Sequence, residues 1–337
     1  MVHNPVALFA LATVLAVAPA RALAATALRI LADSQRDTSM QVGQDMAALA
    51  ANKADVDLAV VPSIASDSLR RLRYESTVQL AIVQADVYQA MLDAADRGDP
   101  EATDIVRPLR VVMPLYHNEL YFIVRADSDL AFVDEIREAR LNLGERGSGT
   151  AHAMAVLHRL LFDAAPPASS THLAPEDALV KLITDRSVDV VSLVAGQPAP
   201  LLSGMKPEAR KFVKLLRWSP RHPASERVYS KYRPMTVRSR SYPNLLAEDL
   251  PALGVRTVLI ANDHESKTLR DALARLARSL CRNLPALQQG GHPKWREVSA
   301  SLPDLGPGWV YHPATAKEIN LCIADRVQGD AAPGVQN

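Results

Sequence analysis

Residues 55–85 read DVDLAVVPSIASDSLRRLRYESTVQLAIVQA, and this segment predicts a strand, a helix and a second strand. The first strand, 55–63, contains Pro62 near its end, the helix covers Ser63–Tyr74, and the second strand covers 78–85. Both strands are short, apolar and rich in β-branched residues without strict alternation, as expected when helices cover both faces of a sheet. Strand–helix–strand units of this length predict a mostly parallel α/β sheet.

The same alternation extends on both sides of this segment. Further strand-like runs are found at 26–33, 140–145, 188–196 and 255–263, a helix is expected at 132–139, and an irregular, proline-rich edge is expected at 197–254. The run LRVVMPLYHNELYFIVRADS (109–128) is too long for one buried strand, and Pro114 interrupts it. We expect an extended crossover from one lobe into another there.

The composition is that of an ordinary globular protein, with 48% hydrophobic and 22% charged residues in a chain of 337. This length allows one large or two ordinary domains. The 38 Lys and Arg residues nearly balance the 37 Asp and Glu residues. Because a surface for nucleic acid or anionic lipid usually needs an excess of basic charge, the balance excludes nucleic acid as the expected partner.

The first 24 residues predict a signal peptide. The uncharged run VALFALATVLAVA (6–18) has the length of a signal-peptide core, and Ala22-Leu23-Ala24 is a small-x-small cleavage site. A second candidate site is Ala20-Arg21-Ala22, and an uncleaved anchor or a buried helix is the alternative. Cleavage after residue 24 would remove one charged side chain, Arg21, and leave equal numbers of basic and acidic residues. We therefore expect export to the periplasm.

The chain contains two cysteines, Cys281 and Cys322. Because no cysteine precedes Cys281, we expect no lipid anchor at the N-terminus. In an oxidising compartment two lone cysteines commonly pair, so we expect a disulfide that closes a loop of about 40 residues. Two buried free thiols are the alternative.

A glycine-rich segment, Gly144-Glu145-Arg146-Gly147-Ser148-Gly149-Thr150, joins an expected strand to an expected helix. Glycines allow backbone amides to point outward, and the start of a helix carries about half a positive charge. The hydroxyls of Ser148 and Thr150 can cap the helix or donate to a ligand. We therefore expect an anion site, for a carboxylate or a phosphate, made by Gly147, Ser148, Gly149 and Thr150. A capped helix without a ligand is the alternative.

The sequence contains no complete motif for catalysis or metal binding. The glycine-rich segment lacks the Lys of a Walker motif, the spacing of a nucleophile elbow and the third glycine of a dinucleotide motif. His152 and His158 are six residues apart, whereas a two-His metal pair on a helix is four apart. We expect no enzyme activity, no cofactor and no metal site. An exported hydrolase would have to use Ser148 with His152, for which no orienting carboxylate is evident.

Three blocks of sequence resemble the TAXI family of TRAP-transporter solute-binding proteins. They are LAIVQADVYQA (80–90), LYFIVRADSDLAFVDEIREARLNLGERGSGTAHAMAVL (120–157) and DALVKLITDRSVDVVSLVAGQPAPLL (177–202). The middle block is the most specific, because an Arg-Ala-Asp-Ser turn precedes a glycine/serine loop that opens a helix. The resemblance spans roughly residues 55–320. It implies an α/β, two-lobed periplasmic-binding-protein type II fold with mostly parallel sheets and two hinge crossovers.

The resemblance also implies where the lobes and the ligand lie. One lobe would comprise residues 25–117 plus 256–337, the other would comprise 118–255, and the ligand would occupy the cleft between them. The ligand carboxylate would lie at Ser148–Thr150. Since open α/β sheets bind ligands at the ends of strands, three more residues are expected to edge the cleft: Gln84, Gln197 and Tyr116. For each of them a purely structural role is the alternative.

One wall of the expected pocket departs from the family pattern. Family members usually carry a glycine- and tyrosine-rich loop after the first strand, whereas residues 32–40 here read ADSQRDTSM. Ser34 of this loop is expected to line the pocket. Arg36 either supplies a cation for a second acidic group or points to solvent.

Taken together, the resemblance implies an exported solute-binding receptor that captures a small organic anion, such as an amino acid or a carboxylate. The expected partners are this ligand and the TRAP permease membrane subunits, and the protein is expected to be a monomer. The alternative is a periplasmic ligand-sensing adaptor for a membrane signalling receptor.

Overall fold

The structure is a computed structural model and describes residues 25–33, 37–263 and 266–331. The expected signal peptide, residues 1–24, and the expected pocket residue Ser34 lie outside these ranges.

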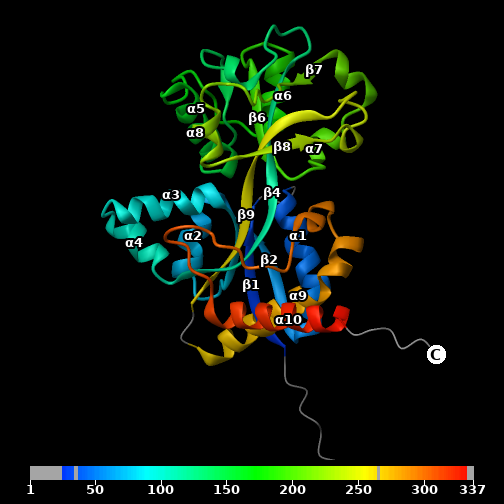
Figure 1. The fold of residues 1–337 in the computed structure, drawn as a ribbon. Helices are drawn as coiled ribbons and strands as arrows, with labels where there is room; N and C mark the ends of the chain where they lie inside the picture. Colours follow the sequence, from blue (N-terminus) through cyan, green and yellow to red (C-terminus); the bar gives the residue numbers. More distant parts are fainter. Residues whose placement is uncertain (1–24, 34–36, 264–265, 332–337) are drawn as a thin grey trace, which may run out of the picture.

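Two long strands, β4 (Leu109–Arg125) and β9 (Leu250–Asn262), join two bodies of the molecule. Figure 1 shows one body above the other, with β4 and β9 side by side between them. The structure therefore has the expected two-lobed α/β fold with two crossovers.

A single nine-stranded sheet runs through both bodies in the described part of the chain. Its order is β2-β1-β3-β9-β4-β6-β5, with β7 beside β4 and β8 beside β9. Apart from β4 and β9 the strands are short: β1 (Thr26–Ala32), β2 (Val56–Pro62), β3 (Leu80–Gln84), β5 (Leu141–Asn142), β6 (Val190–Ala195), β7 (Val213–Leu215) and β8 (Arg233–Val237).

The strand directions correct one part of the expectation, that of mostly parallel sheets. β1 is parallel to β2 and β3, and β5 is parallel to β6, as strand–helix–strand units require. β4 and β9 are antiparallel to each other and to the other strands with which they pair. The reason is that one crossover leads out of the first body and the other leads back, so the two strands run in opposite directions through the middle of the sheet.

The buried apolar side chains form two sets of clusters. One set comes from residues 28–116 and 258–319, and the other comes from residues 120–255. We call the corresponding bodies the first lobe and the second lobe.

Helices cover both faces of the sheet in the first lobe (Figure 1). Alternate residues of β3 show this directly: Leu80 and Ile82 belong to one cluster, whereas Ala81 and Val83 belong to another. The helices of this lobe are α1 (Thr38–Asp45), α2 (Ala65–Tyr74), α3 (Ala85–Asp96), α4 (Pro100–Val106), α9 (Lys267–Gly290) and α10 (Pro313–Ala331).

A disulfide between Cys281 of α9 and Cys322 of α10 confirms the expected pairing. Both residues are 2% exposed, and their Cα atoms are 6.3 Å apart. The bond holds the C-terminal helix against the long helix α9.

The helices of the second lobe are α5 (Gly149–Phe162), α6 (Pro175–Ile183), α7 (Pro200–Ser203) and α8 (Ser225–Tyr229). The prediction of a helix at 132–139 is wrong, because only a single 3-10 turn, Val133–Glu135, forms there. The Glu135 carboxylate accepts hydrogen bonds from the amides of Ala131 and Phe132 and so caps this turn.

β4 is one continuous strand in spite of Pro114. Its register against β9 shifts between Val111 and Met113 and again between Pro114 and His117. Such irregularities accommodate a proline, which has no amide hydrogen to donate to the ladder. The two crossovers therefore remain paired where they pass from lobe to lobe.

Candidate functional site

The glycine-rich loop predicted to bind an anion lies where α5 begins, at the interface of the two lobes. Ser148 is the N-cap of α5, and its Oγ accepts a hydrogen bond from the amide of Ala151 at 3.1 Å. The Oγ1 of Thr150 accepts a bond from the amide of Val194 in β6 at 3.1 Å. Both hydroxyls therefore already accept a bond within the second lobe.

Two of the three glycines of this loop, Gly147 and Gly149, touch the first lobe. The amide of Ser66 in α2 donates to the carbonyl oxygen of Gly147 at 3.0 Å. A Cβ atom placed on Gly149 would lie 2.5 Å from Nε2 of Gln84. A residue without a side chain is thus required for the start of α5 to approach Gln84 this closely.

Gln84, at the C-terminal end of β3, lies between the start of α5 and a small polar pocket. Its side chain is 8% exposed, and it lines the pocket with Asn118. Neither Gln84 Oε1 nor Asn118 Oδ1 has a hydrogen-bond partner within the described residues. Because buried polar atoms are normally paired, two unpaired oxygens at one pocket indicate a place for a donor from a ligand.

The same pocket has an acidic wall. Asp33 and Asp37 line it, and Asp37 caps α1 by accepting a bond from the amide of Ser39 at 2.7 Å. Burial raises the pKa of the Asp37 carboxyl above its ordinary value. A larger groove of about 840 Å³ continues from Asp37 into the second lobe, where it is lined by the acids Glu145, Glu176 and Asp177. The described walls of the cleft therefore present carboxylates beside the predicted anion site.

The structure places Tyr116 inside the core of the first lobe, where it is fully buried. Its backbone carbonyl accepts a bond from the hydroxyl of Thr257 at 3.0 Å. Burial raises the pKa of its phenol well above the usual value, and the nearby Asp37 carboxylate raises it further. Tyr116 does not line the polar pocket itself, but it binds Thr257, which does.

Gln197 is half-buried and lines a groove of about 870 Å³, but its side chain is held in a hydrogen-bond network. Its backbone amide donates to Oε2 of Glu119 at 2.9 Å, and its Nε2 donates to Oε1 of Glu119 at 2.8 Å. Its Oε1 accepts a bond from the amide of Arg238 at 2.9 Å. The side-chain amide is therefore fully engaged within the protein.

At the centre of this network is an ion pair that the sequence analysis missed. The Nζ atom of Lys294 lies 2.6 Å from Oε1 of Glu119 and 2.6 Å from Oε1 of Glu297. The side chains of Lys294 and Glu119 are 1% and 0% exposed. Lys294 belongs to the first lobe and Gln197 to the second, so the network ties the lobes together behind the cleft.

Sequence signals for the missed residues differ in kind. Asp37 directly precedes a helix, the usual place of a capping aspartate, and Asn118 lies just after the register shift that β4 makes between Pro114 and His117. The burial of Lys294 had no local signal, because its partner Glu119 is 175 residues away.

We next examine the described residues for a metal site and for a nucleophile–base pair. They contain no group of three or more His, Cys, Asp or Glu side chains placed to hold a metal ion. The side chains of Ser148 and His152 form no hydrogen bond with each other there: Ser148 Oγ accepts from the amide of Ala151, and His152 Nε2 has no partner within the described residues. In the same residues, no helix is long and apolar enough to cross a membrane.

Solved structures with a similar arrangement include several binding proteins. One, from Methylobacillus flagellatus, is described as the periplasmic sulfonate-binding protein of a sulfonate ABC transporter. It is 12% identical to this chain, the match covers 79% of this chain and 70% of that one, and the TM-score is 0.48. The arginine-, lysine- and histidine-binding protein of Geobacillus stearothermophilus is 11% identical, with 83% and 98% covered and a TM-score of 0.46. A protein of Prochlorococcus marinus in complex with methylphosphonate is 9% identical, with 76% and 84% covered and a TM-score of 0.47.

At these identities and scores, the neighbours carry no argument about the ligand or partners of this chain. None of the curated proteins compared with the chain matches it significantly. The family model described as the NMT1-like family matches residues 30–317, which is most of the sequence. The chain therefore belongs to the NMT1-like family.

Proposed function

We propose that the protein is an exported solute-binding receptor that captures a small amino acid in the cleft between its lobes. The observation that supports this most strongly is the position of Gln84. Its side chain touches Gly149 at the start of α5 and also lines the pocket that contains Asp37 and Asn118. One ligand of modest size could therefore reach both the helix start and the acidic wall.

The charges on the two sides of Gln84 match an amino acid. The start of α5 favours a negative group, because the N-terminal end of a helix carries a partial positive charge and its first backbone amides can donate to an anion. The Asp37 carboxylate and the unpaired oxygens of Gln84 and Asn118 favour a positively charged donor. An α-carboxylate and an α-ammonium group would satisfy these two requirements together, whereas a simple carboxylate satisfies one.

Binding requires the lobes to separate and close again. The pocket beside Gln84 has a volume of about 20 Å³ in the present arrangement, which is room for about one water molecule. Since β4 and β9 connect the lobes, we propose that a bend in these two strands opens the cleft. No bond of the ligand is made or broken in this process.

We further propose that the receptor acts in the periplasm after removal of residues 1–24, as a monomer, and delivers its ligand to TRAP-type membrane permease subunits. The three blocks that resemble the TAXI family support this assignment. Closure moves the surface of one lobe relative to the surface of the other. A permease that contacts both lobes could therefore distinguish the loaded receptor from the empty one.

A thermal-shift screen tests the proposal. The mature chain is heated with each common amino acid and with small carboxylates, and the same screen is run on Asp37→Asn and on Asp57→Asn. Asparagine still caps a helix, so the first change removes only the charge at the pocket. Asp57 lies on β2, exposed and without a described partner, and serves as the control.

We expect at least one amino acid to raise the melting temperature of the wild type and the Asp57→Asn variant, and to raise that of Asp37→Asn much less. If no amino acid in the screen stabilises the wild type, or if Asp37→Asn responds as the wild type does, the proposed ligand is wrong.

A further inference from the structure

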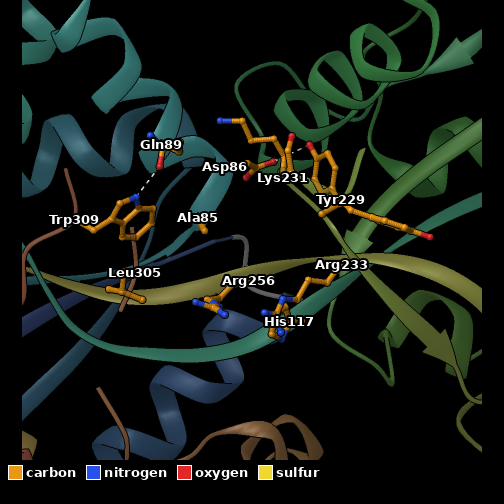
Figure 2. A pocket seen from close by; sticks show the side chains of 13 residues that line it. Ala85, Asp86, Gln89, His117, Tyr229, Lys231, Arg233, Arg256, Leu305 and Trp309 are labelled. Atoms are coloured by element: carbon orange, nitrogen blue, oxygen red, sulfur yellow. Dashed lines mark hydrogen bonds between the residues drawn. The ribbon is translucent and has the colours of Figure 1, made fainter. Parts of the chain in front are cut away.

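A second cavity lies between the lobes, away from the pocket of Asp37 and Asn118. It has a volume of about 230 Å³ and is shown in Figure 2. Its walls come from the start of α3 and a loop near Trp309 in the first lobe, and from the α8–β8 connection in the second lobe. Figure 2 shows Arg233, Arg256 and His117 grouped on the side formed by the crossover strands.

The sheet brings these three side chains together. On β9, Arg256 lies opposite His117 of β4. Two residues earlier on β9, Gly254 lies opposite Arg233 of β8. Residues directly opposite each other, and residues two apart on one strand, lie on the same face of a sheet. The two guanidinium groups therefore share one face, and Gly254 adds no side chain between them.

The local electrostatics agree with this geometry. Burial lowers the pKa of Arg256 below its ordinary value, and the charge of Arg233 lowers it further. Burial, with added effects from Arg256 and Arg233, lowers the pKa of His117 to about 4, so this imidazole is neutral at physiological pH. Two cations thus repel each other across a partly buried cavity.

Within the described residues, neither the Arg233 nor the Arg256 guanidinium group has a hydrogen-bond or ion-pair partner, although other charged side chains at this cavity do. Lys231 lies 3.5 Å from the carboxylate of Asp93. Asp86 accepts a bond from the hydroxyl of Tyr232 at 3.1 Å, and burial raises the pKa of its carboxyl. The positive charge of the two arginines is therefore not balanced by the acid that lines the cavity.

We propose that this cavity is a second binding site, for a small organic dianion that both arginines bind. Guanidinium groups form paired hydrogen bonds with carboxylate and phosphate oxygens, and an arriving dianion would remove the repulsion between them. Tyr229, Leu305 and Trp309 add apolar walls for the remainder of the ligand. Because these walls come from both lobes, the dianion binds most tightly to the closed arrangement.

Isothermal titration calorimetry with succinate and with inorganic phosphate tests this site. The variants are Arg233→Gln and Arg256→Gln, and the control is Arg227→Gln, an exposed arginine of α8 that does not line the cavity. Arg233 is itself exposed, so its replacement is not expected to disturb folding, and the melting temperature without ligand verifies this for each variant.

We expect the wild type to bind one or both probes, each variant to bind about tenfold or more weakly, and the control to bind as the wild type does. Preference for succinate identifies a dicarboxylate, and preference for phosphate identifies a phosphorylated ligand; either supports the proposal. Absence of binding to the wild type, or equal binding by both cavity variants and the control, overturns it. Neither arginine lines the pocket of Asp37 and Asn118, so the effect of these two variants is independent of the first site.

Discussion

The buried ion pair between Lys294 and Glu119 predicts a large and pH-dependent loss of stability when the lysine is replaced by methionine. The two side chains are 1% and 0% exposed, with 2.6 Å between Nζ and Oε1. Lys294→Met keeps the volume but leaves the Glu119 carboxylate buried without its cation. Breaking a buried pair in this way costs about 3–5 kcal/mol of folding free energy.

The sign of the pH dependence follows from Glu119. Burial already raises the pKa of this carboxyl, and the Lys294 charge opposes that rise. Without the lysine the pKa in the folded protein rises further above the unfolded value. A raised carboxyl pKa means that the folded protein holds the proton more tightly, so stability falls as pH increases through that pKa. The variant should therefore lose more stability relative to the wild type at about pH 8 than at about pH 5.

Equilibrium urea unfolding at both pH values measures this difference, with Glu119→Gln/Lys294→Met as the matched control. The double variant has no charged side chain at positions 119 and 294, so it should be more stable than Lys294→Met alone. A loss below about 1 kcal/mol for Lys294→Met, or a loss that is equal at both pH values, would refute the assignment of a buried ion pair that ties the lobes together.

Three further predictions concern the disulfide, the lobe contact and the ligand. Replacing Cys281 and Cys322 by serine should lower the free energy of unfolding by about 4 kcal/mol, from the loop entropy of 41 residues; an unchanged urea midpoint would contradict this. Gly149→Val should hold the lobes apart and increase the radius of gyration in small-angle X-ray scattering, whereas Gly290→Val, where a Cβ would meet nothing within 4 Å, should not. Amino-acid affinity of the wild type, measured by calorimetry, should fall as pH decreases toward the raised pKa of Asp37, because protonation removes the charge that binds the ammonium group; an affinity that stays constant over this range would contradict the role of Asp37.

The alternation of strands and helices was predictable because it depends on local periodicity. Residues 55–85 contain β2, α2 and β3 in the expected order, with boundaries that differ by a few residues. The crossover at 109–128 was recognisable because an apolar run of that length exceeds an ordinary buried strand. The disulfide was predictable because the sequence has two cysteines and the N-terminal residues indicate export.

Other features depend on contacts between distant residues and left no local signal. The antiparallel direction of β4 and β9 cannot be derived from periodicity, since an apolar strand has the same pattern in either direction. That Arg233 and Arg256 line the same cavity depends on the register of β8 against β9. The glycine-rich loop was recognised as the start of a helix, but its close contact with Gln84 depends on how the lobes meet.

Native mass spectrometry of the purified mature chain most directly tests whether this is an amino-acid receptor. After exchange into volatile buffer and addition of the amino acid that stabilises it most, the wild type should show one bound molecule per chain. Asp37→Asn should lose this adduct, and Asp57→Asn should retain it. Absence of the adduct in the wild type, or its equal presence in Asp37→Asn, would contradict a ligand site beside Gln84 and Asp37.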